Sequence, residues 1–172
     1  MALGASWLLT GCTGAAAAPV LLAAAKKGAP DRGGTLRIAR QPASEAETLD
    51  PAGALSAYEY LGALYNRLVR VDANGDLAPD LAESWEPDAQ ARTWTFRIRE
   101  GVTFHDGRRL TAADAAYTLR HILDKATASP QAAVLAPLID PKRLRTPDEH
   151  TLVVPPKTPN AEFPRLVTHY NC

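Results

Sequence analysis

The stretch GVTFHDGRRL, residues 101–110, places His105 directly before Asp106, and enzymes use these two residue types as a general base and its orienting carboxylate. Adjacent residues on an extended chain point to opposite sides, so Asp106 cannot orient the His105 ring. Asp106-Gly107 is instead a common turn dipeptide between a strand and the next element. The sequence therefore predicts a turn here and not a catalytic pair.

Metal and cofactor chemistry find no support in the spacing of the other polar residues. The four histidines and two cysteines lack the short separations of zinc ligands. Asp76, Asp80 and Glu83 do not follow the spacing of an EF-hand calcium loop, and Pro79 interrupts them. Neither a G-x-S-x-G elbow, a P-loop nor a dinucleotide fingerprint is present. The sequence predicts no enzyme, no metal site and no cofactor.

Apolar periodicity predicts the elements that hold these residues. We expect strands over residues 35–39, before the Asn74-Gly75 turn of 68–79, over 92–100 and over 150–156. We expect helices over 56–68 and 111–125 and a last helix capped by Asn160. Thr111 and Asp114 have the spacing of a capping box. Strands and helices mix without regular alternation, so the predicted fold class is α+β, that is, mixed α/β.

The same patterns predict which side chains form the core. Trp94, Phe96 and Ile98 alternate with polar residues in a half-buried strand, and Trp85 is a second aromatic core anchor. The two longer helices each have an apolar face, which consists of Tyr58, Leu61, Leu64 and Tyr65 in the first and of Ala112, Ala115, Leu119, Ile122, Leu123 and Ala126 in the second.

Bulk composition excludes some functions. The 172 residues are 46% hydrophobic and 22% charged, as in soluble globular proteins, and suffice for one domain or one and a part. Lys plus Arg equals Asp plus Glu at 19 each, so the formal net charge is zero. A nucleic-acid partner normally requires a basic excess, so none is expected.

The N-terminal residues MALGASWLLTGC predict export. Their apolar run ends in Leu-Thr-Gly-Cys, which fits the bacterial lipobox, so Cys12 is the predicted lipidation site and membrane anchor. One alternative is signal cleavage after the alanines at 23–25, which would release a soluble protein, and another is that neither processing step occurs. Residues 1–32 are the predicted leader and tether, and 33–172 the folded part. Because the chain stops within an amphipathic segment, we expect it to be a fragment.

Four stretches together resemble the family 5 extracellular solute-binding proteins of ABC transporters, the peptide- and nickel-binding group. These stretches are ETLDPA (47–52), YNRLVRVDANGDLAPDLAESWE (65–86), TWTFRIREGVTFHDGRRLTAADAAYTL (93–119) and DEHTLVV (148–154). The chain departs from the family's pattern at Gln90-Ala91-Arg92, where an Asp-Gly turn is usual. It also has Asn66-Arg67 in place of the usual Glu-Gly.

The resemblance implies a two-lobed clamp of the periplasmic-binding-protein type II kind, of which this chain would supply the first segment of lobe one and most of the small extra domain. It implies capture of an extracytoplasmic or periplasmic solute, most often a peptide, for delivery to an ABC permease and its ATPase. The polar, proline-bounded loop from Pro42 to Asp50 is the expected contributor of ligand contacts, with Ser44, Glu45 and Glu47 as the predicted residues. The alternatives are an exported enzyme such as a peptidase, a sensor or chaperone on a related fold, and a non-functional fragment.

Overall fold

The computed structural model describes residues 33–35, 37, 48–54, 58–169 and 172. The chain divides into two units, Met1–Arg40 and Gln41–Cys172, and nearly all described residues belong to the second. The strand predicted over 35–39 lies largely outside the described residues. Within these ranges no helix is long and apolar enough to cross a membrane.

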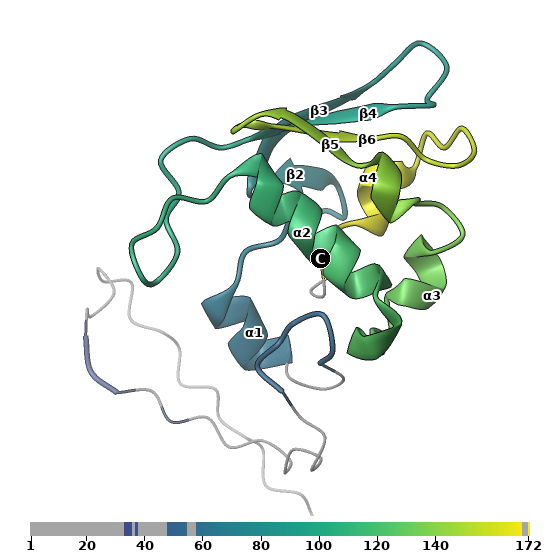
Figure 1. Cartoon of the computed structure of the whole chain (residues 1–172). Helices are drawn as coiled ribbons and strands as arrows, with labels where there is room; N and C mark the ends of the chain where they lie inside the picture. Colours follow the sequence, from purple (N-terminus) through teal and green to yellow (C-terminus); the bar gives the residue numbers. More distant parts are fainter. Residues whose placement is uncertain (1–32, 36, 38–47, 55–57, 170–171) are drawn as a thin grey trace, which may run out of the picture. The chain divides into compact units, whose positions relative to one another are not determined.

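A four-stranded antiparallel sheet forms one layer of the second unit (Figure 1). The predicted aromatic strand is β4, and its side chains alternate as expected, with Trp94, Phe96 and Ile98 buried. Trp85 in the neighbouring strand is partly buried against the same core. The strand order is β3 (Ala82–Pro87), β4 (Trp94–Ile98), β6 (Thr151–Val154) and β5 (Arg145–Asp148).

A separate two-stranded hairpin pairs β1 (Val69–Val71) with β2 (Leu77–Pro79). The predicted turn between them is confirmed. Gly75 has a φ of 88°, a backbone conformation that favours glycine, and its N–H donates to the carbonyl of Asp72 at 3.1 Å. The Asp72 carboxylate accepts hydrogen bonds from the N–H groups of Asn74 and Asp76 and so closes the turn.

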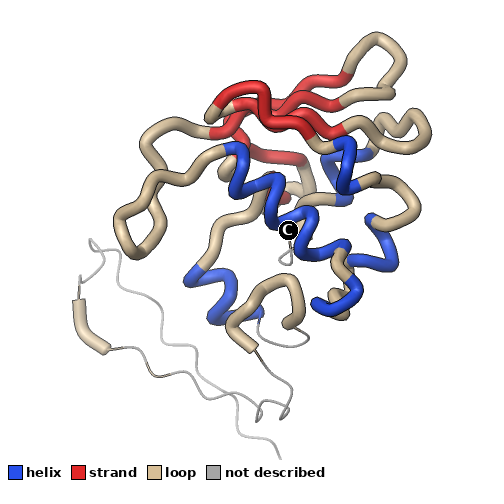
Figure 2. Tube along the Cα trace, in the orientation of Figure 1, coloured by secondary structure: helices blue, strands red, loops and turns tan. Residues whose placement is uncertain are grey.

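The long helix α2 (Ala112–Leu123) lies along the inner face of the four-stranded sheet (Figures 1 and 2). Its predicted capping box forms, with the Asp114 carboxylate accepting from the backbone N–H of Thr111 at 2.8 Å and from its hydroxyl at 2.7 Å. Its fully buried residues are Ala112, Ala116, Leu119 and Ile122.

The predicted face of this helix was only partly right. Ala115 and Leu123 are partly buried, whereas Ala126 is exposed and lies beyond the helix. The helix stops at Leu123 because Asp124 takes an extended conformation and its carboxylate accepts from the N–H of Ala126, which begins the short 3-10 turn η1 (Lys125–Thr127).

Three short elements lie between η1 and the C-terminal residues, and the first and last of them bury side chains. They are α3 (Ala132–Leu135), η2 (Pro141–Arg143) and α4 (Phe163–Leu166). Phe163 meets Phe96 edge to face, with ring centroids 6.2 Å apart. The predicted cap residue Asn160 does not cap α4, which begins after Glu162. The Asn160 side chain instead accepts a hydrogen bond from the N–H of Glu162, in the turn before the helix.

The first helix, α1 (Tyr58–Leu64), is shorter than the predicted 56–68. The chain leaves the helix because the Asp80 carboxylate accepts from the Asn66 side chain at 2.8 Å and from the N–H of Arg67 at 2.9 Å. The predicted buried face is also wrong in part. Leu61 is buried, but Leu64 and Tyr65 are 41% and 43% exposed.

The observed architecture is a mixed α/β arrangement, as predicted. The strands β3 and β5 were not predicted from the sequence. Both are edge strands, whose side chains are mostly exposed or partly buried, so neither has the clear apolar alternation of β4.

Candidate functional site

The pair His105–Asp106 lies in a turn, as predicted. Gly107 has a φ of 85° and its N–H donates to the carbonyl of Phe104. Asp106 accepts from the N–H and the guanidinium of Arg108, at 3.0 and 2.8 Å. These bonds hold the pKa of the Asp106 carboxyl below its ordinary value, because they favour the ionised form. The Asp106 carboxylate therefore forms its hydrogen bonds within the turn.

The His105 ring makes a different contact, which sequence reasoning missed. Its Nε2 lies 3.0 Å from the backbone carbonyl oxygen of Leu64, at the end of α1. A helix end leaves carbonyl groups without partners in the helix, and this imidazole satisfies one of them. His105 thus joins the turn to α1 and has no contact with Asp106 that would form a catalytic pair.

The predicted ligand residues Ser44, Glu45 and Glu47, and the predicted lipidation site Cys12, lie outside the described residues. The described residues that follow them along the chain are those of the loop Thr48–Ala54. In this loop the N–H of Asp50 donates to the Thr48 hydroxyl oxygen, and an Asp50 carboxylate oxygen accepts from the N–H of Ala52, each at 3.0 Å. Ala52 and Ala54 are buried, so the loop is anchored at its far end.

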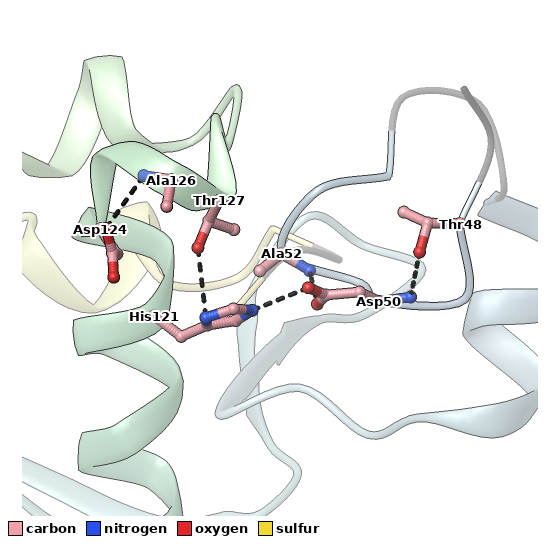
Figure 3. Close-up of polar contacts among 7 residues, drawn as sticks. All are labelled: Thr48, Asp50, Ala52, His121, Asp124, Ala126 and Thr127. Atoms are coloured by element: carbon pink, nitrogen blue, oxygen red, sulfur yellow. Dashed lines mark hydrogen bonds and ion pairs between the residues drawn. The ribbon is translucent and has the colours of Figure 1, made fainter.

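Figure 3 shows how α2 reaches this loop. His121, in the last turn of α2, points its ring at the loop, and its Nε2 lies 2.7 Å from the second carboxylate oxygen of Asp50. The other ring nitrogen, Nδ1, lies 3.2 Å from the hydroxyl oxygen of Thr127 in η1. Asp50 and His121 are 71 positions apart, so no local spacing signalled this pair.

A cavity of about 400 Å³ opens between α1, the turn at 104–107 and α2. Several of its polar side chains have partners within the protein. The Asp114 carboxylate binds Thr111, the Thr118 hydroxyl donates to the carbonyl of Asp114, and the Asn66 amide donates to Asp80. The remaining lining is largely apolar and includes Leu64, Leu68, Phe104, Leu110, Leu119 and Cys172.

Of the acidic residues that could suggest calcium, Asp80 already has partners within the protein. Its carboxylate accepts from the Asn66 side chain and from the N–H of Arg67. Asp76 lies in the hairpin turn, where its N–H donates to Asp72. Over the described ranges, no group of three or more His, Cys, Asp or Glu side chains could hold a metal ion.

Residues 76–172, more than half of the chain, match the family described as bacterial extracellular solute-binding proteins, family 5 Middle. The chain belongs to family 5. This is a family of solute-binding proteins and not of enzymes, as the sequence analysis predicted.

Individual relatives support the assignment to family 5. The chain is 30% identical over 148 residues to the periplasmic oligopeptide-binding protein OppA of Escherichia coli, which covers 77% of this chain and 27% of OppA. It is 30% identical over 151 residues to the periplasmic murein peptide-binding protein MppA of the same organism, covering 77% and 28%. A shorter match, 39% over 61 residues, is to the E. coli nickel-binding periplasmic protein and covers 36% and 12%.

Solved structures of similar proteins have the same fold over this part. Haemophilus influenzae OppA in complex with RPPGFSPFR superposes with a TM-score of 0.64 at 30% identity, covering 72% of this chain and 27% of that one. AgaA of A. tumefaciens R10 in complex with agropinic acid gives 0.66 at 30% identity, covering 74% and 26%. The chain thus spans about a quarter of the length of the first relatives that it matches.

Proposed function

We propose that this protein is the substrate-binding component of an ABC importer, which captures peptides outside the cytoplasm and delivers them to a membrane permease. The observation that carries the proposal is the family match over residues 76–172. It is supported by the relatives, whose names include oligopeptide-, dipeptide- and murein peptide-binding proteins. The oligopeptide- and murein peptide-binding proteins are described as periplasmic.

In this proposal the described part is a piece of a two-lobed clamp of the periplasmic-binding-protein type II kind. Residues 33–172 contribute the first segment of lobe one and most of the small extra domain. The polar loop before α1 supplies solute contacts through Ser44, Glu45 and Glu47, while the second lobe supplies the others. Cys12 carries the lipid anchor that keeps the clamp close to its permease, and residues 1–32 are the leader and tether.

The experiment is a binding measurement on the protein expressed from its own locus. Isothermal titration with the peptide RPPGFSPFR and with trialanine should give saturable binding with a Kd in the micromolar range or tighter, equivalent to roughly −8 kcal/mol. Glu45→Gln and Glu47→Gln should each weaken binding about ten-fold, because each removes a charge from the solute-facing loop. Glu100→Gln, in the turn after β4, is the matched control and should leave Kd unchanged.

Two other outcomes would change the solute class. The relatives include a nickel-binding protein and a protein solved with agropinic acid. Binding of a nickel–histidine complex or of an opine, with no binding of either peptide, would refute the peptide assignment and retain the transport role. Hydrolysis of the peptides by the purified protein would instead support the exported-enzyme alternative.

A further inference from the structure

The ring of His121 is held on three sides. Nε2 faces the Asp50 carboxylate at 2.7 Å, and Nδ1 faces the Thr127 hydroxyl at 3.2 Å (Figure 3). The Tyr117 ring, one helical turn earlier, stacks on the imidazole with centroids 5.7 Å apart and planes 10° from parallel. These contacts come from three different segments of the chain, so the ring has a defined orientation.

The chemistry of the partners assigns a hydrogen to Nε2. An ionised carboxylate only accepts hydrogen bonds, so Nε2 must donate to Asp50. The Thr127 hydroxyl can donate or accept, so Nδ1 can be bare in the neutral ring or protonated in the charged ring. The bridge to Asp50 is therefore available in both charge states of His121.

Asp50 shapes the loop that His121 holds. One carboxylate oxygen accepts from the N–H of Ala52 while the other meets the imidazole. The loop also passes close to η1. A Cβ added to Gly53 would lie only 3.5 Å from the carbonyl oxygen of Thr127. A shift of Asp50 would consequently break a hydrogen bond within the loop and the bridge from the loop to α2 together.

We propose that His121 is a positioning residue for solute capture, which fixes the Thr48–Ala54 loop against the end of α2 through Asp50. The residues proposed to contact solute directly precede this loop in the sequence. Because the chain is continuous, the position of the loop limits the positions open to these residues. This inference rests on the proposed function. A purely structural bridge would affect stability but not the affinity for solute.

The first test needs no ligand. Hydrogen exchange measured by mass spectrometry on the protein from its own locus compares the wild type with His121→Phe and His121→Gln. Phe keeps the stacking on Tyr117 but removes both hydrogen bonds, whereas the Gln amide reaches the position of Nε2 and can still donate to Asp50. We expect amides of residues 48–54 to exchange about ten-fold faster in His121→Phe and near the wild-type rate in His121→Gln. Amides of β4 and β6 report whether the sheet is intact, and equal loop exchange in all three proteins would overturn the proposal.

The second test measures affinity for RPPGFSPFR in the same proteins. We expect a Kd about ten-fold weaker in His121→Phe and within about three-fold of wild type in His121→Gln. Ile122→Val is the matched control, since it loosens the buried face of the same helix and leaves the loop contacts in place. A loosened loop with unchanged affinity in His121→Phe would show a structural role only and refute the proposal.

Failure of the proposed function gives a different pattern. If the wild type binds neither peptide, agropinic acid nor a nickel–histidine complex, solute capture is refuted, and the role of His121 in that capture is refuted with it. The exchange measurement still decides whether His121 fixes the loop, so the two failures are distinguishable.

Discussion

At the scale of single residues, Ala91 occupies a backbone conformation that side chains disfavour. Its φ is 52°, in the left-handed region, where a residue with a Cβ costs roughly 1–2 kcal/mol. It stands in the turn between β3 and β4, at the place where the family's Asp-Gly turn is missing from the sequence. The turn forms nonetheless, because the Asp88 carboxylate accepts from the N–H of Arg92 at 2.7 Å.

Ala91→Gly should therefore raise the free energy of unfolding by up to about 1 kcal/mol, since relief of strain exceeds the added entropy of the unfolded chain. Urea denaturation measures the change. Ala89→Gly is the control in the same turn. Ala89 has no positive φ, so this variant should be neutral or destabilised by about 0.5 kcal/mol. Equal effects of both substitutions would contradict the strain at Ala91.

Cys172 gives a second prediction at this scale. Its side chain is partly buried against the main core, and loss of contact with water raises the pKa of the thiol to about 12. The thiolate is the reactive form, so the folded protein should react with a thiol reagent near pH 8 much more slowly than the denatured protein, by a factor of about a hundred or more. A Cys12→Ser background isolates this thiol. Rapid modification under native conditions would contradict its burial.

The sequence predicted the roles of residues whose partners are local. The turn at Asp106-Gly107 and the capping box at Thr111 depend on neighbours within a few positions. The contacts of His105 and His121 could not be predicted, because Leu64 and Asp50 lie 41 and 71 positions away and only the tertiary fold brings them together.

At the scale of elements, aspartates close several turns, namely those at Asp72, Asp88, Asp106 and Asp148. The pKa of each is lowered from its ordinary value of 3.8. For Asp72, Asp88 and Asp148 the main cause is a backbone hydrogen bond, and for Asp106 it is the Arg108 side chain. A carboxyl with a lowered folded pKa contributes stability above its unfolded value, and that contribution is lost as the pH falls through the folded pKa.

We therefore expect the urea midpoint to fall as the pH is lowered from about 5 to about 2. Asp88→Asn should lower the midpoint at about pH 6, and the difference should shrink as the pH falls through the folded pKa of Asp88, where the wild-type carboxyl loses its charge. A constant difference between the two proteins across this range would contradict the assigned titration.

Helix α2 depends on its N-terminal capping box. Asp114→Ala removes the acceptor for the N–H and hydroxyl of Thr111 and should lower the free energy of unfolding by about 1 kcal/mol. Asp114→Asn retains an acceptor oxygen and should cost less. Thermal unfolding followed by circular dichroism measures both, and a wild-type melting temperature in Asp114→Ala would contradict the role of the cap.

Helix α1 shows where pattern reasoning about elements reaches its limit. The apolar spacing through Tyr65 predicted a longer helix with Leu64 and Tyr65 inside. Hydrogen bonds that Asn66 and Arg67 donate to Asp80 redirect the chain after Leu64. Asp80 lies in a segment for which no structure was predicted. Tertiary polar contacts of this kind override local periodicity.

At the scale of the whole described unit, the edge-to-face pair of Phe96 and Phe163 connects the sheet to α4. Both rings are fully buried, so Phe163→Ala should cost about 3–5 kcal/mol, a large part of the stability of an ordinary domain. Val134→Ala, at a side chain 42% exposed, should change stability by less than about 0.5 kcal/mol. Chemical denaturation of the two variants provides the comparison, and similar losses would contradict a core centred on this pair.

The mixed α/β class and the family could be predicted from the sequence, because strong alternation and the motif order are properties of the chain itself. The strand order β3-β4-β6-β5 could not, because it depends on which edges meet after the helix between β4 and β5 folds back.

The pairing of β4 with β6 sets an order of events during synthesis. Arg97 and Thr151 face each other across this pair although they are 54 positions apart. At about 5–20 residues per second, the ribosome delivers β6 roughly 3–11 s after β4. Until then the nascent β3–β4 hairpin has an open edge at β4, because the strand that pairs with it has not been made. The chain is thus most exposed to wrong pairing in this interval, when a chaperone would be of most use.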